Sequence, residues 1–420
     1  MDRPRDNTPI NTDRRPLGAD YWRLWTSSGL SNLADGTFKV SLPLVAIQFT
    51  QSPTLIAGLA FALTVPWLLF ALPAGALADR MDRRRAMLGA NLVRAALAGV
   101  LGLAVVFDFA SIWLLYLIGF CIGTAETIYD TSAQSILPQI VSRDRLSLAN
   151  GQLYAGEVTA NEFLGPPLGG ALVAVSAVVA FAAPAALWIA AVGALLVVAG
   201  RFRVARTEPS TLRADIVEGL RFLWHQRVLR ALAVMTGLFN LATSATFAIM
   251  VLYAVGPASA MRLTDTGYGV LLAALAGGSI IGSLIAAPVE RVLGRSASLV
   301  LNYLASALLV GISALTANPY VIGAAFFIGS ITIVISNVVI VSLRQRIAPD
   351  RLLGRVNSGY RLVAWGTKPL GAVIGGGLAQ LFGLRAVFAI MAVVILALIG
   401  FLPILTNKAM DAAEQATASS

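Results

Sequence analysis

The chain consists mainly of apolar segments long enough to cross a lipid bilayer. A helix needs about 20 residues to span a hydrocarbon core of about 30 Å. Only helices satisfy their own backbone hydrogen bonds there at this length and hydropathy. Twelve such segments are 24–49, 54–78, 86–107, 111–137, 148–174, 179–200, 229–255, 266–289, 297–316, 319–343, 356–382 and 384–405. The sequence therefore predicts an all-α membrane protein with twelve transmembrane helices.

Composition excludes several other classes of protein. Residues are 57% hydrophobic and only 12% charged, whereas a soluble domain carries about 25% charged residues. A soluble enzyme, a disordered chain and a secreted disulfide scaffold are thereby excluded. The single cysteine, Cys121, and the single histidine, His225, argue against a disulfide, a metal site or a histidine relay. We therefore predict no metal and no cofactor, and a protein that is not an enzyme.

The basic residues predict how the chain is oriented. Loops that face the cytoplasm are enriched in Lys and Arg. We place the 31 basic residues in or beside the N-terminus, the alternate loops and the C-terminus, with four exceptions. Arg262 and Arg385 fall in the opposite loops, and Lys39 and Lys368 lie inside predicted helices. This predicts a bacterial inner-membrane protein with both termini in the cytoplasm, and it explains the net charge of +10 without a nucleic-acid partner.

The sequence divides into two similar halves. GLSNLADGTF, GALADRMDRRR, VSRDRLSLANG and PPLGGALV recur in the same order as GLFNLATSATF, APVERVLGRSA, APDRLLGRVNS and KPLGAVIGG. Such a repeat predicts two pseudo-symmetric six-helix bundles with a transport pathway between them. We expect a cytoplasmic N-terminal segment 1–23, bundles at 24–200 and 229–405, a linker 201–228 and a tail 406–420. The linker should form an amphipathic surface helix, and the small polar tail should be disordered.

Charged residues inside the predicted helices are candidates for a functional site. A charge at a helix centre costs about 2.5–3.5 kcal/mol on insertion scales, so it marks an interior cavity or an ion pair. These residues are Asp35, Lys39, Glu126, Asp130, Glu157, Glu162 and Lys368. Asp35 and Lys39, spaced i, i+4, can pair along one helix face, and Glu126 and Asp130 have the same spacing.

Two neighbouring carboxylates in a low dielectric cannot both ionise cheaply, so one should hold a proton near neutral pH. We therefore predict proton coupling at Asp35 first, then Glu126, then Glu162, with Lys39 beside them. For each acid a static ion pair is the alternative. The acids all lie in the amino-terminal half. The carboxy-terminal half is expected to supply substrate contacts, with Lys368 as its buried charge.

A short basic motif resembles a transporter family signature. GALADRMDRRRAM, in the loop after the second helix, is similar to motif A of the major facilitator superfamily. The similarity departs at Asp82, where many members carry Gly, and it covers Gly75, Leu77, Ala78, Asp79, Arg80, Arg83 and Arg84. The resemblance implies that Asp79 docks near Gly354 to Asn357 and latches the outward-facing state, and that Arg83 pairs with Asp130.

A second motif refines this resemblance. GPPLGG, with Gly165, Pro166, Gly169 and Gly170, is similar to the antiporter motif of drug exporters in this superfamily, although Asn161 replaces the usual upstream Gly. An ordinary kinked packing helix is the alternative. The chain resembles the group that contains macrolide efflux proteins, the enterobactin exporter and actinobacterial Tap-type pumps. This implies proton-coupled export of amphipathic small molecules by a monomer.

The alternatives differ in substrate, direction or class. A siderophore exporter or an importer of a small metabolite would have the same fold. A non-transporting receptor or a membrane enzyme would leave the acids inside the helices without a reason, and the sequence shows no catalytic constellation to support it. Aromatic residues within the helices are candidates for contact with an apolar substrate. They are Trp67, Tyr129, Tyr154, Phe163, Phe239, Phe247 and Trp365.

Overall fold

The computed structural model describes residues 17–142, 145–198, 200, 202, 212–349 and 352–418. Within these ranges, side chains are described except at 71–80, 134–135, 138, 147, 212–216, 353–354, 358 and 416–418. Over the described residues the regular structure is helical, apart from one β-bridge between Val255 and Leu263.

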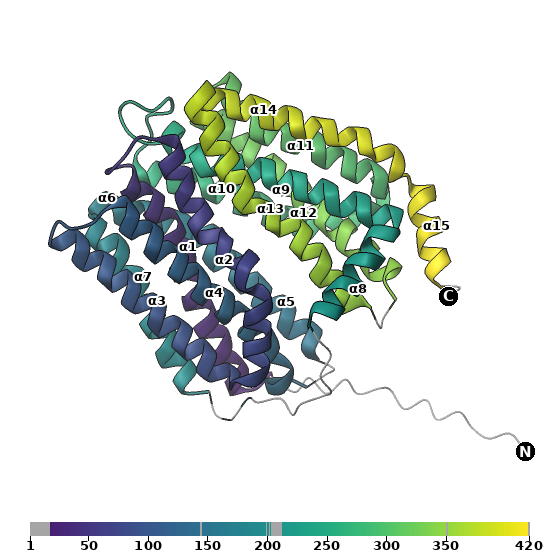
Figure 1. The fold of residues 1–420 in the computed structure, drawn as a ribbon, viewed down its shortest axis with the longest axis horizontal. Coiled ribbons are helices and arrows are strands. Elements are labelled where there is room, and N and C mark those ends of the chain that lie inside the picture. Colours follow the sequence, from purple (N-terminus) through teal and green to yellow (C-terminus); the bar gives the residue numbers. More distant parts are fainter. Residues whose placement is uncertain are drawn as a thin grey trace, which may run out of the picture.

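Six membrane crossings form the amino-terminal half (Figure 1). They are α1 (Ala19–Ala46), α2 (Pro53–Arg80), α3 (Arg83–Val106), α4 (Ile112–Ile140), the composite α5 (Leu146–Glu157), η2 (Val158–Leu164) and α6 (Gly165–Val175), and α7 (Ala177–Leu196). The fifth crossing is divided because η2 is a π-helical turn that directly precedes the prolines of α6. Proline removes a backbone donor and disrupts the regular helical ladder.

Six further crossings form the carboxy-terminal half, which is joined to the first by α8 (Leu212–His225). They are α9 (Arg227–Ala254), α10 (Asp265–Leu293), α11 (Arg295–Leu315), α12 (Pro319–Ile347), α13 (Leu353–Phe382), and α14 (Leu384–Ala397) with η3 (Leu398–Ile404). A last helix, α15 (Asn407–Ala418), follows.

The two halves repeat the same packing. In the first half α1 contacts α6 and α7, α3 contacts α4 and α7, and α2 contacts α4. In the second half α9 contacts α13 and α14, α11 contacts α12 and α14, and α10 contacts α12. Each set follows from the other when helices are matched in chain order, so the two six-helix bundles are pseudo-symmetric. The class of fold predicted from the sequence is confirmed.

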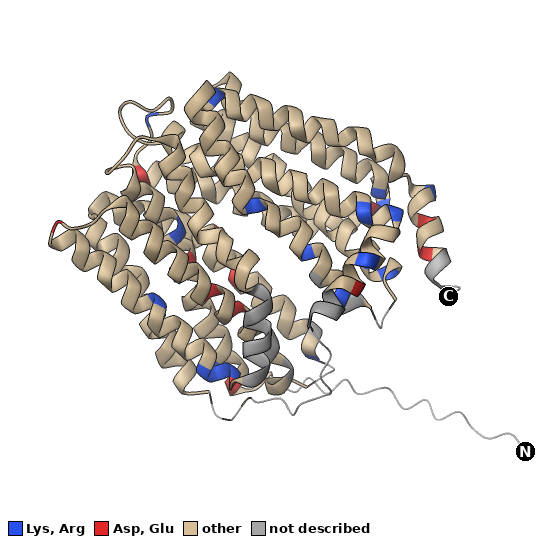
Figure 2. Cartoon of the chain, in the orientation of Figure 1, with Lys and Arg blue, Asp and Glu red and all other residues tan. Residues whose placement is uncertain are grey.

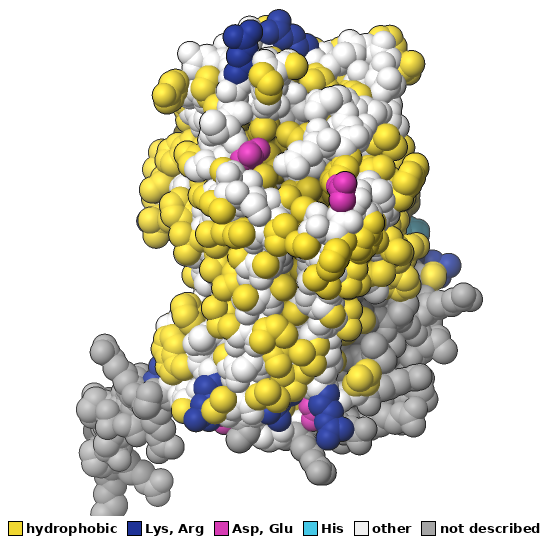
Figure 3. All heavy atoms as spheres, turned by 90° about the vertical axis from the view of Figure 1, so that its left-hand side faces the viewer, with side chains coloured by type: hydrophobic (Ala, Val, Ile, Leu, Met, Phe, Trp, Pro, Cys, Tyr) yellow, Lys and Arg dark blue, Asp and Glu magenta, His cyan; other side chains and the backbone are white. Residues whose placement is uncertain are grey.

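The outer surface is suited to lipid. Nine described helices are long and apolar enough to cross a membrane. The remaining three crossings are α1 and α13, which carry charged residues, and the divided fifth crossing. Figure 3 shows one face covered mainly by hydrophobic side chains, with basic side chains at its upper and lower margins. Figure 2 places most Lys and Arg at the end of the molecule that carries both termini, hereafter the terminal end.

The halves meet at the other end, hereafter the closed end, which carries the loops 47–52 and 255–264. Ser52 and Thr54 donate hydrogen bonds to Gln380 of α13, each at 3.4 Å. The small residues of α6 lie directly against the start of α10, because a Cβ on Gly170 would collide with the backbone of Asp265. These contacts join the two bundles at the closed end.

Two segments outside the crossings are helical. α8 packs on the start of α13, where Glu218 forms an ion pair with Arg355 and Leu223 is fully buried. The prediction of a disordered tail is wrong. α15 places Met410 in the core, and Arg295 at the start of α11 pairs with Asp411 and Glu414. Composition suggested disorder because it does not reveal that a cation on a distant helix neutralises the acids of the tail.

Candidate functional site

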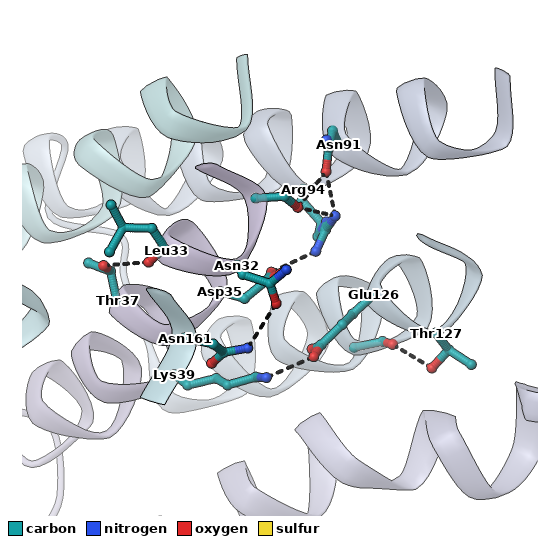
Figure 4. Close-up of polar contacts among 12 residues, drawn as sticks. Asn32, Leu33, Asp35, Thr37, Lys39, Asn91, Arg94, Glu126, Thr127 and Asn161 are labelled. Carbon is teal, nitrogen blue, oxygen red and sulfur yellow. Dashed lines mark hydrogen bonds and ion pairs between the residues drawn. The ribbon is translucent and has the colours of Figure 1, made fainter. Parts of the chain in front are cut away.

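A fully buried ion pair lies inside the amino-terminal bundle. The Arg94 guanidinium of α3 donates to the Asp35 carboxylate of α1 at 2.6 Å, and the two side chains are 0% and 3% exposed (Figure 4). Arg94 also donates to the Ser31 hydroxyl at 3.0 Å and to the Asn91 side-chain oxygen. The rings of Tyr129 and Trp188 lie 4.7 and 5.4 Å from the guanidinium carbon. The guanidinium is therefore held by an acid, two polar groups and two aromatic faces.

Sequence reasoning missed Arg94. It lies well inside the predicted helix 86–107, and that position was the available signal. The predicted pairing of Asp35 with Lys39 is wrong, because the Asp35 carboxylate is directed toward α3 and the Lys39 ammonium toward α4. Helical spacing allows an i, i+4 pair, but a partner on a neighbouring helix competes for each charge.

A second ion pair, Lys39 with Glu126, joins α1 to α4. The Lys39 ammonium lies 2.7 Å from the Glu126 carboxylate, and the side chains are 38% and 11% exposed. Asn32 of α1 accepts a hydrogen bond from Asn161 of η2 at 3.4 Å, which adds a polar contact between α1 and the divided crossing (Figure 4). The Lys39–Glu126 pair is therefore more exposed than the Asp35–Arg94 pair, which is fully buried.

Lys39 also faces a cavity between the two halves. The cavity has a volume of about 280 Å³ and is enclosed by α1, α2, α9 and α10. Its lining is almost wholly apolar and includes Leu63, Phe247 and Tyr268. An apolar cavity with one ammonium group at its wall can hold an amphipathic small molecule.

The remaining membrane-level charges face one another across the halves. Glu157 and Glu162 are exposed, and Asp130 is half-buried. Lys368 of α13 lies within electrostatic reach of Glu162 and Lys39, and Arg361 lies within reach of Asp130. Sequence reasoning missed Arg361, which lies within α13 inside the predicted helix 356–382 and is exposed.

The aromatic candidates fall into different environments. Tyr129 is 1% exposed and packs on Arg94, so it belongs to the interior of the amino-terminal bundle and does not line the cavity as predicted. Tyr154, Phe163 and Trp365 are exposed, and Phe247 lines the cavity. Phe239 is partly buried against the core. Burial of a ring beside a cation depends on helix packing, which sequence does not specify.

The motif after α2 is only partly described. The side chains of Gly75, Asp79 and Arg80 lie outside the described residues. Arg83 is 7% exposed, and its backbone amide donates to the Phe202 carbonyl at 3.2 Å; its pairing with Asp130 stays a prediction. Arg84 instead donates to the carbonyl groups of Leu195 and Leu196. Asp82, at the position of the family's Gly, caps α3 through the Arg85 amide at 3.1 Å and accepts from the Phe202 amide at 3.0 Å.

The GPPLGG motif lies where three helices meet. A Cβ on Gly165 or Gly169 would collide with the backbone of α1 at Gly36 and Thr37, and Gly269 of α10 packs on Pro166. These small residues therefore let α6 contact α1 and α10 at once. The motif therefore forms part of the contact between the halves at the closed end.

Comparisons with known proteins agree with this architecture. Residues 13–420 match the transmembrane secretion effector family, so the chain belongs to this family of major facilitator transporters. It is 26% identical over 404 residues to the multidrug efflux pump Tap of Mycolicibacterium fortuitum, covering 90% of this chain and 92% of Tap. It is 22% identical over 393 residues to macrolide efflux protein A of Streptococcus pyogenes, covering 90% and 93%.

Solved structures share the fold. A mutant of the nucleoside transporter NupG has a TM-score of 0.77 at 12% identity, covering 92% of this chain and all of that chain. A bacterial homologue of the iron transporter ferroportin, in an inward-facing state, has a TM-score of 0.73 at 17% identity, covering 93% and 99%. The protein is thus a multi-pass membrane transporter, not an enzyme.

Proposed function

We propose that this protein exports amphipathic small molecules from the cytoplasm in exchange for protons, by alternating access between its two bundles. The observation that carries the proposal is the Lys39–Glu126 pair, with Lys39 partly exposed, beside an apolar cavity between the halves. The names of the relatives, a multidrug efflux pump and a macrolide efflux protein, support the direction of transport. We further propose that the protein is a monomer in the bacterial inner membrane. Its terminal end is assigned to the cytoplasm because basic residues gather there.

The pair supplies a proton-dependent contact between α1 and α4. When Glu126 takes up a proton, its charge attraction to Lys39 is lost, and the ammonium becomes free to turn toward the cavity. When the proton leaves, the pair forms again. In this proposal Glu126 carries the proton, and the orientation of the Lys39 ammonium relative to the cavity depends on the charge of Glu126. Glu162 is a second proton acceptor near Lys368.

Asp35 takes a different role in this proposal from the one that its sequence position suggested. Its carboxylate is 3% exposed and bonded to Arg94, so a proton reaches it less readily than it reaches Glu126. We assign the Asp35–Arg94 pair to positioning α1 against α3. The nearby Ser31 and Asn91 complete that polar cluster.

The proton gradient is energetically sufficient. One proton that crosses 100 mV releases about 2.3 kcal/mol. At about 1.4 kcal/mol per factor of ten, this supports a substrate gradient of roughly fiftyfold. No nucleotide and no other cofactor is needed for such transport.

The test is dye efflux from proteoliposomes with an imposed proton gradient. The dyes are the cation rhodamine 123 and its free acid, rhodamine 110. We expect gradient-driven transport of at least one dye, its loss with a protonophore, and its loss in Glu126→Gln. Glu290→Gln, the same change on α10 outside the cavity, is the matched control. Full gradient-driven transport by Glu126→Gln would refute the coupling assignment, and transport that ignores the gradient would refute proton exchange.

A further inference from the structure

A stripe of two cations and a tryptophan runs along α13. Arg361, Trp365 and Lys368 are spaced i, i+4 and i+7, so they share one helix face. The Arg361 guanidinium carbon lies 4.6 Å from the Trp365 ring centroid, and the Lys368 ammonium nitrogen lies 5.1 Å from it. Trp67 of α2 packs edge-to-face on Trp365, with ring centroids 5.8 Å apart. Together with Trp67, the stripe therefore combines two positive charges with two large aromatic surfaces.

The two cations of this stripe are not in ion-pair contact with any described acid. Among the described residues, neither the Arg361 nor the Lys368 side chain makes an ion pair or a side-chain hydrogen bond. Two other cations inside the crossings do form ion pairs, Arg94 with Asp35 and Lys39 with Glu126. Charges without ion-pair partners are costly at this depth, so a bound anion would stabilise this face of α13.

The stripe faces the space between the halves. Lys368 is within electrostatic reach of Glu162 and Lys39, and Arg361 is within reach of Asp130, although none of these groups comes within ion-pair distance of the stripe. Arg361 and Trp365 are exposed. A molecule that enters between the bundles can therefore contact the stripe directly.

We propose that the α13 stripe binds the carboxylate of an amphipathic substrate. Arg361 and Lys368 would donate hydrogen bonds to the carboxylate, because charge-assisted bonds of this kind are the stronger ones. Trp365 and Trp67 would pack against the substrate's aromatic or apolar part. This inference rests on the proposed transport function and adds a substrate class to it. The favoured substrates are amphipathic carboxylates, including zwitterions, rather than simple lipophilic cations.

The test uses a matched pair of dyes and needs no proton gradient. Rhodamine 110 carries a free carboxylate, and rhodamine 123 is its methyl ester. Binding of each dye to the purified full-length protein in detergent is measured by fluorescence anisotropy. We expect the wild type to bind rhodamine 110 about tenfold more tightly, which corresponds to about 1.4 kcal/mol.

Variants assign the preference to the stripe. Arg361→Gln and Lys368→Gln should each weaken rhodamine 110 binding by about tenfold, which is about 1.4 kcal/mol, and leave rhodamine 123 binding unchanged. Lys368→Arg keeps the charge and should retain the preference. Arg385→Gln removes an exposed cation at the closed end, at the start of α14, and is the matched control. Gel filtration and thermal unfolding establish that each variant is folded.

Three results would overturn the proposal: equal or tighter binding of the ester by the wild type, a preference that survives both glutamine variants, or no binding of rhodamine 110. If the cations serve only Glu162 and Asp130, the glutamine variants would change proton coupling and leave the dye preference intact. The proposed function fails separately. A carboxylate preference without gradient-driven transport would leave this inference standing and remove proton-driven export.

Discussion

Removal of Arg94 should be among the most damaging single substitutions in the protein. Arg94→Leu keeps an apolar side chain of moderate size in the site but leaves the Asp35 carboxylate 3% exposed and without its cation. Breaking a buried ion pair by removing one partner costs about 3–5 kcal/mol. Asn91 and Ser31 also lose a bonding partner. We therefore expect the free energy of unfolding to fall by about 3–5 kcal/mol.

A double-mutant cycle separates the pair from its surroundings. Arg94→Leu combined with Asp35→Asn removes both charges, so no unpaired ion remains in the bundle. We expect the double variant to lose about 1–3 kcal/mol less free energy of unfolding than the sum of the losses in the two single variants. The assay is unfolding of the purified protein by titration with SDS, followed by circular dichroism. The Arg23–Asp20 pair, with side chains 42% and 38% exposed, is the matched control, and Arg23→Leu should cost less than about 1 kcal/mol.

Two results would refute this reasoning. One is a loss of stability in Arg94→Leu no greater than that in Arg23→Leu. The other is strict additivity in the cycle, because it would mean that the two charges do not stabilise each other. The cycle also bears on the mechanism. If Asp35→Asn alone abolished gradient-driven transport while leaving stability unchanged, Asp35 would be the proton carrier and Glu126 would not.

Two further predictions concern the closed end and the tail. Gly170→Leu should wedge α6 away from α10, because even a Cβ there would collide with the Asp265 backbone; we expect dye transport to fall about tenfold at unchanged expression. The control Gly193→Ala should transport normally, because an added Cβ there meets open space. A normal transport rate in Gly170→Leu would show that the halves need not close at this point. Met410→Ala should lower the free energy of unfolding by about 2–5 kcal/mol, because Met410 of α15 is fully buried. The exposed Met81 provides the comparison, and equal losses for Met410→Ala and Met81→Ala would mean that α15 does not dock as described.

Local signals predicted some features of the site and missed others. GPPLGG indicated close helix approach, and the structure places it between α1 and α10. The departure at Asp82 gave no indication of its use as a cap for α3 and as an acceptor for Phe202. Close helix approach at GPPLGG depends on side-chain size, which the sequence gives directly. The role of Asp82 depends on Phe202, a residue far along the chain that only folding brings close.

The sequence by itself determined the number of crossings, the duplication and the choice of helices. These follow from the length and hydropathy of single segments, because a bilayer permits few other solutions for the backbone. Tertiary structure decided which charges pair. Asp35 is bonded to Arg94 and Lys39 to Glu126, while Arg361 and Lys368 form no ion pair with a described residue. Each of these outcomes depends on how the helices are rotated about their axes and packed together, and hydropathy does not specify that rotation.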